Sequence, residues 1–441
     1  MRAFNQEPEQ CWECYSCVKA CPQNAIDVRG YADFAPLGHS VRVDRDEQKG
    51  TIAWKIKFRN GTEKNFLSPI TTKPWGTAIP KLADVPAPSK EMRDGELLYN
   101  EPKYIRMDEG GLRGLVDHWL HGFDAAAHLQ RLNRQPQYRA QAGGIGLHFV
   151  HHQGQGDRGL PLVLLHGWPS SYLEYLEVAE ALAQDHDVVV VSLPNTGFSE
   201  QSTTLMGPRA MAHAVHALMT EVLGYRRYVA HGSDWGSILA SWLGNDFPAQ
   251  VAGIHMSMIS PRFVAGAVQG PEEQQWLAGF RERFEDDGAY FRQQTSRPHT
   301  LAFLLADSPV GLLAWQAEKF MAWSDPAMGS ASEKIAQPAW KDRLVLNTWL
   351  QLVSGTAASA TLIYRGLAVE GAPGFPQGGR VNVPVAVAAM RDPAFPAPPR
   401  SLVERVYRVE RWTDYAHGGH FPGYEAADLL GADLRAFAQA L

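Results

Sequence analysis

Residues 231–237 read HGSDWGS, and this short stretch decides the fold predicted for most of the chain. Its central residue, Asp234, has a glycine two positions before it and another two positions after it. This spacing of small residues is typical of the sharp strand-to-helix turn that exposes a nucleophile. Serine is the usual nucleophile there, whereas an aspartate carboxylate is ionised at neutral pH and needs no base. We therefore expect Asp234 to attack an sp3 carbon and to form an ester.

Apolar runs on both sides of this turn predict the strands of a sheet. They are short, rich in β-branched residues and separated by segments of helix length: residues 160–165, 187–193, 225–230, 251–256 and 381–388. Another strand is expected at 145–152, after a helical stretch at 112–133. Ser171 and Glu174 predict a capping box at the start of the first core helix. This alternation predicts an α/β class with a mostly parallel sheet, helices on both faces and catalytic groups at the strand ends.

Two backbone amides are predicted to stabilise the second half of the reaction. Hydrolysis of an Asp234 ester creates an oxyanion at the carboxyl carbon, which needs nearby N–H donors. The stretch HGWP at 166–169 follows the strand at 160–165 and can present the N–H of Trp168. The N–H of Trp235, directly after the nucleophile, is its expected counterpart. Trp168 and Trp235 together form the predicted oxyanion hole.

A histidine and an acid should activate the water that cleaves the ester. His420, in the sequence GGHF late in the chain, follows the order nucleophile, acid, histidine. The acid should lie on a loop after a late strand and accept the Nδ1–H of His420. Asp392 follows the strand at 381–388 and fits this position best, with Glu404 and Asp414 as the alternatives.

Residues from about 112 to 441 resemble epoxide hydrolases of the microsomal type, which have an α/β-hydrolase fold. The similar stretches are GFDAAAHLQRLNRQPQY, LLHGWPSSYLEYLEV, SLPNTGFS, HGSDWGS, RPHTLAFLLADSPVGLLAWQAEKF and RWTDYAHGGHF. The resemblance implies a helical lid at about 262–378 and the hydrolysis of a small hydrophobic epoxide by water to a vicinal diol, without a cofactor. It also implies two lid tyrosines that hydrogen-bond the epoxide oxygen, Tyr290 and Tyr364. A phenol can donate its proton to the alkoxide that ring opening creates.

Another class of hydrolase is an alternative interpretation of the same turn. A haloalkane dehalogenase also uses aspartate, often followed by tryptophan, at this position. It stabilises a halide ion, however, and has no need of two lid tyrosines. A serine esterase is disfavoured because position 234 has no hydroxyl group.

All four cysteines lie in one short run, at Cys11, Cys14, Cys17 and Cys21, so a disulfide framework is implausible. The run CWECYSCVKACP has the spacing of thiolates that bind a 4Fe-4S cluster, and a zinc site is the alternative. In proteins with two such clusters, the first three cysteines bind one cluster and the fourth binds the other. Because the chain has no fifth cysteine, we expect the set of cluster ligands to be incomplete.

Residues 1–112 resemble the C-terminal part of the adenylylsulfate reductase beta subunit. The similarity runs through the cysteine stretch, IAWKIKFRNGTEKNF and TTKPWGTAIPKLADVPAPSKEMRDGELLYNEPKYIRMD. It implies a truncated ferredoxin-like α+β segment for electron transfer, with an extended tail that wraps a redox partner subunit. The alternation at 52–58 and the Asn60-Gly61 turn before 63–66 predict a β-hairpin. The predicted domains are this segment at 1–73, a Pro-rich tail at 74–111 and the hydrolase at 112–441.

The charge and hydropathy patterns argue against several classes of partner. The formal net charge of −6 gives no electrostatic case for nucleic acid or an anionic membrane. The first residues lack the basic and apolar regions of a signal peptide, and no apolar stretch reaches the roughly 18 residues of a membrane span. We expect a cytoplasmic protein that binds neither nucleic acid nor a membrane.

Overall fold

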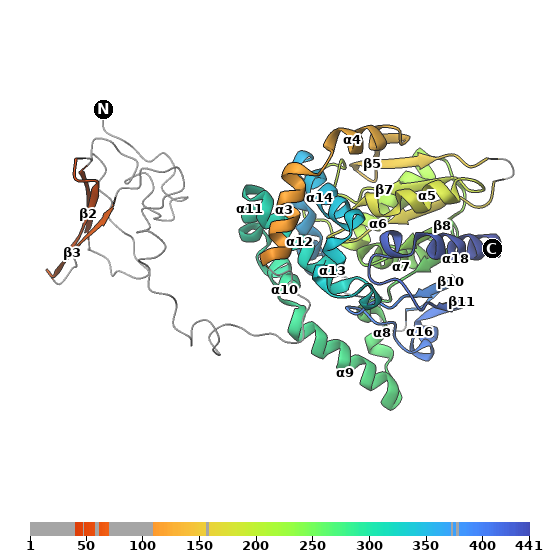
Figure 1. Ribbon diagram of the computed structural model, residues 1–441. Helices are drawn as coiled ribbons and strands as arrows, with labels where there is room; N and C mark the ends of the chain where they lie inside the picture. The colour runs from red at the N-terminus through yellow and green to blue at the C-terminus, as the bar shows by residue number, and fades with distance from the viewer. Residues whose placement is uncertain are drawn as a thin grey trace. The chain divides into compact units, whose positions relative to one another are not determined.

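The computed structural model describes residues 40–46, 48–57, 61–69, 109–155, 158–371, 374–375 and 379–441 (Figure 1). The chain divides into two units, Met1–Pro102 and Lys103–Leu441. The cysteines of the predicted cluster site lie outside the described residues. Most of the predicted tail, at 74–108, also lies outside them, and its last three residues begin a helix.

Three antiparallel strands form a sheet in the first unit. β1 (Ser40–Asp46), β2 (Thr51–Lys57) and β3 (Glu63–Pro69) lie in that order across the sheet. The hairpin of β2 and β3 pairs Lys57 with Glu63, as the turn signal predicted, and extends further than the sequence indicated, to Pro69. The sequence did not predict β1, in which charged residues outnumber apolar ones. The structure pairs this strand with β2.

An eight-stranded sheet forms the centre of the second unit. Its strand order is β11-β10-β9-β8-β6-β7-β5-β4. The pairs from β7 to β11 are parallel, and β5 is antiparallel to both neighbours, so the predicted mostly parallel sheet is confirmed. The strands are β4 (Gln137–Ala142), β5 (Ile145–His152), β6 (Leu162–Leu165), β7 (Val188–Val191), β8 (Tyr228–Gly232), β9 (Val251–Met256), β10 (Val381–Ala389) and β11 (Tyr407–Asp414).

The sequence predicted the six inner strands and missed the two at the edges. β4 and β11 carry polar and charged side chains at most positions, several of them exposed. An edge strand has one neighbour and can face solvent along its length, so it needs no continuous apolar run. The predicted apolar runs therefore mark only the strands with a neighbour on each side.

Helices cover both faces of this sheet, as predicted. Val163 and Leu165 of β6 belong to one apolar cluster with α6 and α7, while Leu162 and Leu164 belong to another with α5 and α18. Successive side chains of a strand point to opposite faces, so β6 buries apolar surface on both. Burial of each such side chain contributes roughly 1.5–3 kcal/mol relative to exposure. The helices outside the lid are α3 (Glu109–His121), α4 (Ala125–Asn133), α5 (Leu176–Leu182), α6 (Pro208–Ala217), α7 (Trp235–Asp246), α16 (Arg400–Val406), α17 (Pro422–Glu425) and α18 (Ala427–Gln439).

A helical lid lies between β9 and β10, and Figure 1 shows α9 extending away from the other lid helices. Several lid helices begin at a proline, which fixes the backbone at a position where no helical N–H bond is lost. The lid helices are α8 (Pro261–Val264), α9 (Gly270–Asp287), α10 (Ala289–Ser296), α11 (Pro298–Asp307), α12 (Pro309–Trp323), α13 (Ala331–Ala336), α14 (Pro338–Val353) and α15 (Leu362–Glu370). Within the described chain, no single helix is long and apolar enough for a membrane span; α11 and α12 pass that test only as a pair bent by 117°.

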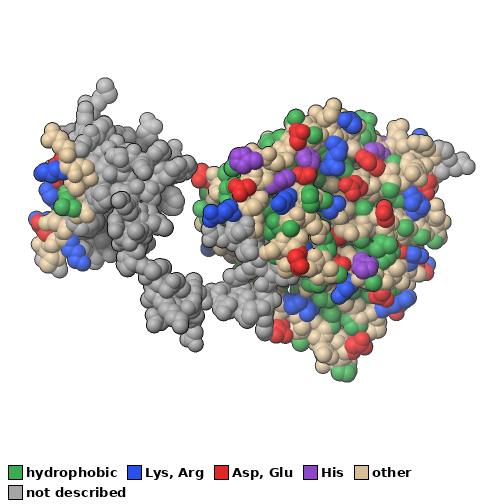
Figure 2. All heavy atoms as spheres, viewed as in Figure 1, with side chains coloured by type: hydrophobic (Ala, Val, Ile, Leu, Met, Phe, Trp, Pro, Cys, Tyr) green, Lys and Arg blue, Asp and Glu red, His purple; other side chains and the backbone are tan. Residues whose placement is uncertain are grey.

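On the face of the second unit seen in Figure 2, acidic and basic side chains are interspersed. Neither sign of charge forms a continuous area on that face.

Candidate active site

The backbone at Asp234 is strained, which is typical of the sharp strand-to-helix turn that its sequence predicts. Asp234 lies between β8 and α7 with φ +47° and ψ −124°, a region that side chains other than glycine rarely adopt. The two glycines of the motif allow this turn to pack tightly. A side chain at Gly236 would clash with the carbonyl of Leu165, and one at Gly232 would clash with Gly236. The two glycines of the sequence motif are therefore required because backbone segments approach each other closely at these positions.

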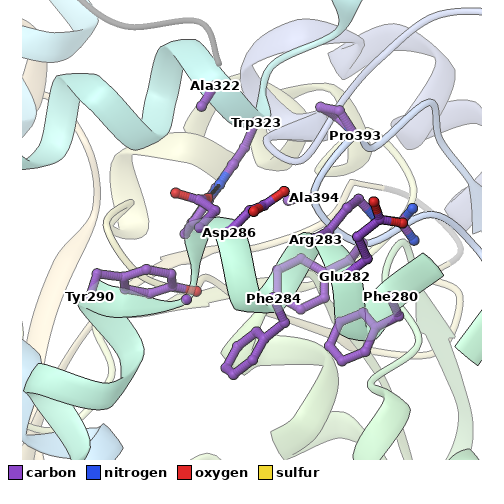
Figure 3. Close-up of a pocket in the computed structure, with 13 residues that line it drawn as sticks. Phe280, Glu282, Arg283, Phe284, Asp286, Tyr290, Ala322, Trp323, Pro393 and Ala394 are labelled. Atoms are coloured by element: carbon purple, nitrogen blue, oxygen red, sulfur yellow. Dashed lines mark hydrogen bonds between the residues drawn. The ribbon is translucent and has the colours of Figure 1, made fainter. Parts of the chain in front are cut away.

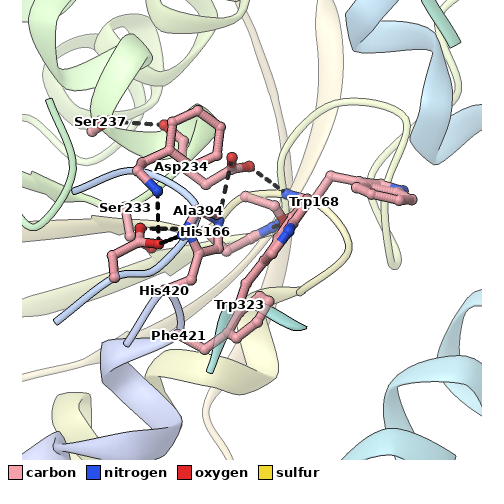
Figure 4. A network of polar contacts seen from close by, with 12 residues as sticks. His166, Trp168, Ser233, Asp234, Ser237, Trp323, Ala394, His420 and Phe421 are labelled. Atoms are coloured by element: carbon pink, nitrogen blue, oxygen red, sulfur yellow. Dashed lines mark hydrogen bonds and ion pairs between the residues drawn. The ribbon is translucent and has the colours of Figure 1, made fainter. Parts of the chain in front are cut away.

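The predicted amide of Trp168 contacts the Asp234 carboxylate directly. β6 and β8 are neighbours, and Leu165 is paired with Gly232, so the loops that follow the two strands lie side by side. The N–H of Trp168 donates a hydrogen bond of 2.8 Å to Oδ1 of Asp234 (Figure 4). Trp235 is the first residue of α7, where the backbone N–H has no acceptor within the helix. The amide of Trp168 thus contacts the carboxyl group that it is predicted to serve, and the amide of Trp235 follows Asp234 directly in the chain.

A buried histidine holds the HGWP loop in place. The Nδ1 atom of His166 lies 2.9 Å from the carbonyl oxygen of Gly167, and its Nε2 accepts from the N–H of Leu193 at 3.2 Å. Burial lowers the pKa of His166 to about 4. The imidazole is therefore neutral at pH 7, with Nδ1 as donor and Nε2 as acceptor.

Of the three acids considered from the sequence, the structure brings Asp392 to His420. The Nδ1 atom of His420 lies 2.7 Å from Oδ2 of Asp392. The other carboxylate oxygen of Asp392 accepts the N–H groups of Ala394 at 2.8 Å and Phe395 at 2.9 Å. These bonds fix the carboxylate, and both Asp392 and His420 are buried.

The other two acids are bound elsewhere. Glu404 accepts a hydrogen bond from Arg400 one helical turn away, at 2.7 Å. Asp414 accepts from the indole N–H of Trp412 at 3.0 Å.

His420 is placed between two carboxylates. Its Nε2 atom lies 3.5 Å from Oδ2 of Asp234, on the side opposite Asp392. Burial by itself lowers the pKa of His420, but the carboxylates of Asp392 and Asp234 outweigh this and raise the pKa to about 10. The imidazole is therefore charged at neutral pH.

Both predicted lid tyrosines lie beside these groups. Tyr290 on α10 stacks on Trp168 with ring centroids 5.3 Å apart, and Tyr364 on α15 meets Trp235 edge to face at 4.8 Å. Their own ring centroids are 6.0 Å apart. Burial raises the pKa of each phenol well above its usual value, and the nearby Asp234 carboxylate raises it further. Both phenols are therefore protonated and able to donate.

The nucleophile and both tyrosines line one cavity of about 270 Å³. Most of its wall is apolar or aromatic, which suits a small hydrophobic ligand. Its lining residues are Asp234, Trp235, Ile238, Met258, Ser260, Pro261, Arg262, Phe280, Phe284, Tyr290, Phe291, Tyr364 and Phe395.

A second cavity of about 430 Å³ adjoins the first (Figure 3). The two share four aromatic wall residues, Phe280, Phe284, Tyr290 and Phe395. This second cavity, called the outer cavity below, is more polar, with Glu282, Arg283, Asp286 and Asp287 among its lining residues. The shared aromatic wall thus separates an apolar chamber at Asp234 from a charged chamber.

Sequence reasoning missed the contacts that tie the histidine loop to the lid. The N–H of His420 donates to the carbonyl of Trp323 at 3.0 Å, and the N–H of Gly418 donates to Asp325 at 2.9 Å. The N–H of Asp325 in turn donates to Glu425 at 2.6 Å. These residues are about a hundred positions apart in the chain, so no local pattern could have revealed the contacts.

The predicted capping box is wrong. Ser171 precedes a short 3-10 helix, Tyr172–Tyr175, and its hydroxyl makes no capping bond. Glu174 is buried and accepts a weak hydrogen bond of 3.4 Å from the N–H of Gly423. Glu174 packs closely against Gly423, since a side chain at position 423 would clash with the backbone carbonyl and the Cγ of Glu174.

In comparisons with known proteins, most of the chain is similar to epoxide hydrolases. A family model described as the epoxide hydrolase N terminus matches residues 87–175, and one described as the alpha/beta hydrolase fold matches 161–427. A candidate epoxide hydrolase of Stigmatella aurantiaca is 34% identical over 336 residues, which covers 74% of each chain. An enantioselective mutant of the Aspergillus niger epoxide hydrolase has a similar structure, with a TM-score of 0.65 and 26% identity, covering 78% of this chain and 90% of that one.

The beginning of the chain matches different families. A 4Fe-4S binding domain model matches residues 6–27, and a model of the adenosine-5'-phosphosulfate reductase beta subunit matches 28–112. The beta subunit of adenylylsulfate reductase from Megalodesulfovibrio gigas is 58% identical over 80 residues. That match covers 18% of this chain and 47% of the subunit.

Proposed function

The chain belongs to the epoxide hydrolase family with an α/β-hydrolase fold, and from this membership we propose that Asp234 opens an epoxide through a covalent ester. The resemblance read from residues 112–441 and the α/β-hydrolase fold are both confirmed. The enzyme is thus a hydrolase that acts on epoxides. The assignment of its catalytic residues is the proposal that follows.

Ring opening uses the Asp234 carboxylate and the lid phenols. One oxygen of Asp234 bonds to an epoxide carbon, the carbon–oxygen bond of the ring breaks, and the released oxygen takes a proton from a lid tyrosine. Tyr290 and Tyr364 line the same cavity as Asp234, so an epoxide held there can meet nucleophile and acid together. The charged His420 then returns a proton to the phenolate.

Ester formation converts His420 from an acid into a base. An Asp234 ester carries no charge, so one of the two carboxylates that raise the pKa of His420 is lost. The pKa of His420 must then fall, and the neutral imidazole can accept a proton from water. The nucleophile therefore controls when the base becomes available, and water is not activated before substrate has reacted.

Hydrolysis restores the enzyme and releases the diol. Water attacks the carboxyl carbon of Asp234 while its proton passes to His420, and the N–H groups of Trp168 and Trp235 stabilise the oxyanion. Collapse of the intermediate expels the diol oxygen, which takes the proton from His420. The acid form of Asp234 then gives its own proton to His420, which recreates the resting ion pair.

The observation that carries this proposal is the single cavity that Asp234 lines together with Tyr290 and Tyr364, two phenols whose pKa values are raised by burial. Incubation with styrene oxide and with 1-chlorobutane tests it against the dehalogenase alternative. We expect the vicinal diol from styrene oxide and no chloride release. Chloride release without diol formation would favour a haloalkane dehalogenase, in which the phenols have no required role.

For the N-terminal segment, we propose a subunit-interaction module of the adenylylsulfate reductase type. The cysteines do not fit a complete 4Fe-4S site within this chain, because three belong to one cluster and Cys21 to another. We therefore assign no electron-transfer step to it. Co-purification with a catalytic subunit of adenylylsulfate reductase would support a binding role, and no association at micromolar concentrations would contradict it.

A further inference from the structure

We propose that Lys319 makes Tyr290, rather than Tyr364, the lid tyrosine that gives its proton to the opening epoxide. Lys319 is a positioning residue in this role, since it acts on the phenol and does not touch substrate. The inference rests on the proposed function of Asp234, and it concerns an asymmetry between two phenols that otherwise line the same cavity.

Lys319 is a buried cation directed at one of the two phenols. It lies on α12, is only 4% exposed, and places its Nζ atom 4.9 Å from the centre of the Tyr290 ring. The same ammonium is 5.7 Å from the ring of Trp323. A desolvated cation at this distance from an aromatic face interacts more strongly than one at the surface.

Acidic neighbours hold the ammonium there. Asp287 forms a short ion pair with Lys319, and Glu318 contacts it at 2.9 Å. The second oxygen of Asp287 accepts the indole N–H of Trp323 at 2.8 Å. The lysine is therefore fixed from both α9 and α12, which border the outer cavity (Figure 3).

Tyr290 needs a cation because carboxylates surround it. Burial raises the pKa of its phenol, and Asp234, Asp287 and Asp392 each raise it further, while a hydrogen bond with Tyr364 lowers it. As the proton leaves, Asp234 becomes a neutral ester, and the phenolate then faces the carboxylates of Asp287 on α9 and of Asp392 in the loop after β10. The Lys319 ammonium is the opposing charge on the ring, and it stabilises the phenolate more than the phenol.

Among the described residues, Tyr364 contacts aromatic rings but has no cation over its own ring. Its ring meets Trp168 at 5.8 Å, Trp235 at 4.8 Å and Phe291 at 5.2 Å. None of the cation–ring contacts in the described part of the chain involves Tyr364. Tyr364 can therefore hydrogen-bond the epoxide oxygen, but among the described residues no cation lies over its ring to compensate the charge left by a proton transfer.

A double-mutant cycle tests the coupling between the cation and each phenol. The single-turnover rate of ester formation with styrene oxide is measured by tryptophan fluorescence for wild type, for the single variants Lys319→Met, Tyr290→Phe and Tyr364→Phe, and for Lys319→Met combined with either tyrosine variant. We expect Lys319→Met to slow ester formation about tenfold alone and with Tyr364→Phe, but to have no further effect with Tyr290→Phe. The same loss in the Tyr290→Phe background would overturn the proposal.

A chemical rescue separates acidity from packing. In Lys319→Met, replacement of Tyr290 by the more acidic 3-fluorotyrosine should recover most of the lost rate, and Lys319→Arg should retain it. A structural role would not respond to the acidity of the phenol, so a failure of the fluorotyrosine to recover the rate would contradict the inference. Lys334→Met is the matched control: Lys334 is also a buried lid lysine, but it binds the carbonyls of Met321 and Ser324.

Two further outcomes remain decisive. If Lys319→Met does not fold, Lys319→Gln takes its place in the same cycle, and an equal loss of rate with and without Tyr290→Phe in that variant would overturn the proposal. If wild type forms no ester with any epoxide, the proposed function fails. Ester formation in wild type without coupling to Lys319 would refute only this inference.

Discussion

The Nε2 atom of His420 lies 3.5 Å from Oδ2 of Asp234, so the base and the nucleophile form an ion pair before substrate binds. This contact makes the protonation of His420 depend on the charge of Asp234. The same histidine cannot accept a proton from water until that charge is consumed by the ester. The contact between His420 and Asp234 thus explains why ester formation must precede the activation of water.

Asp234→Asn should lower the pKa of His420 from the value of about 10 that it has in the resting enzyme. The raised pKa means that the charged form is favoured in the folded state; this stabilisation is complete below about pH 6.5 and is lost as the pH rises through 10. Imidazole NMR titration of a freshly prepared variant, before deamidation can restore aspartate, measures the change. An unaltered His420 pKa would show that Asp234 does not control its charge.

Replacement of the lid phenols should slow ester formation and leave ester hydrolysis nearly unchanged. Tyr290→Phe and Tyr364→Phe each remove one donor to the epoxide oxygen, and we expect losses of about 10²-fold, larger for Tyr290. Stopped-flow fluorescence with styrene oxide separates the two steps. A loss confined to ester hydrolysis would show that the phenols do not act on the epoxide.

Asp392→Asn should have the reverse effect, with ester hydrolysis slowed by about 10²- to 10⁴-fold and the ester accumulating. The asparagine can no longer hold the Nδ1–H tautomer and stabilise the charged imidazole. Mass spectrometry of the quenched enzyme measures the amount of ester. Glu404→Gln is the matched control and should behave like wild type, because Glu404 pairs with Arg400; accumulation of ester in that variant instead would reassign the acid.

Phe284→Ala should enlarge the substrate range. Phe284 is part of the wall between the cavities of about 270 and 430 Å³, and its truncation joins them. We expect a lower KM for epoxides with a long alkyl chain and little change for styrene oxide. Steady-state kinetics with both substrates test this, and an equal change in both KM values would show that the wall does not limit substrate length.

Much of this site could be read from the sequence because its chemistry depends on local patterns. The turn at Asp234 needs glycines at fixed positions, and the inner strands need apolar runs, so both leave a signature. The choice of Asp392 over Glu404 and Asp414 was open, since the sequence does not show which carboxylate reaches His420. That choice depends on a distance between separate loops.

The remaining features depend on packing between distant segments. The edge strands β4 and β11 each have one neighbouring strand and are partly exposed to solvent, so polar residues are tolerated along them. Glu174 had the spacing of a capping residue, but burial under the histidine loop determines its contacts. Likewise, nothing near Lys319 in the sequence indicates that its ammonium lies over Tyr290.

A single turnover in water enriched in heavy oxygen tests the covalent ester most directly. Enzyme in excess over styrene oxide is digested after one turnover, and the peptide that contains Asp234 is analysed by mass spectrometry. The account predicts one heavy oxygen in the Asp234 carboxylate and an unlabelled diol. Label in the diol with none in Asp234 would show direct attack of water on the epoxide and would contradict the account.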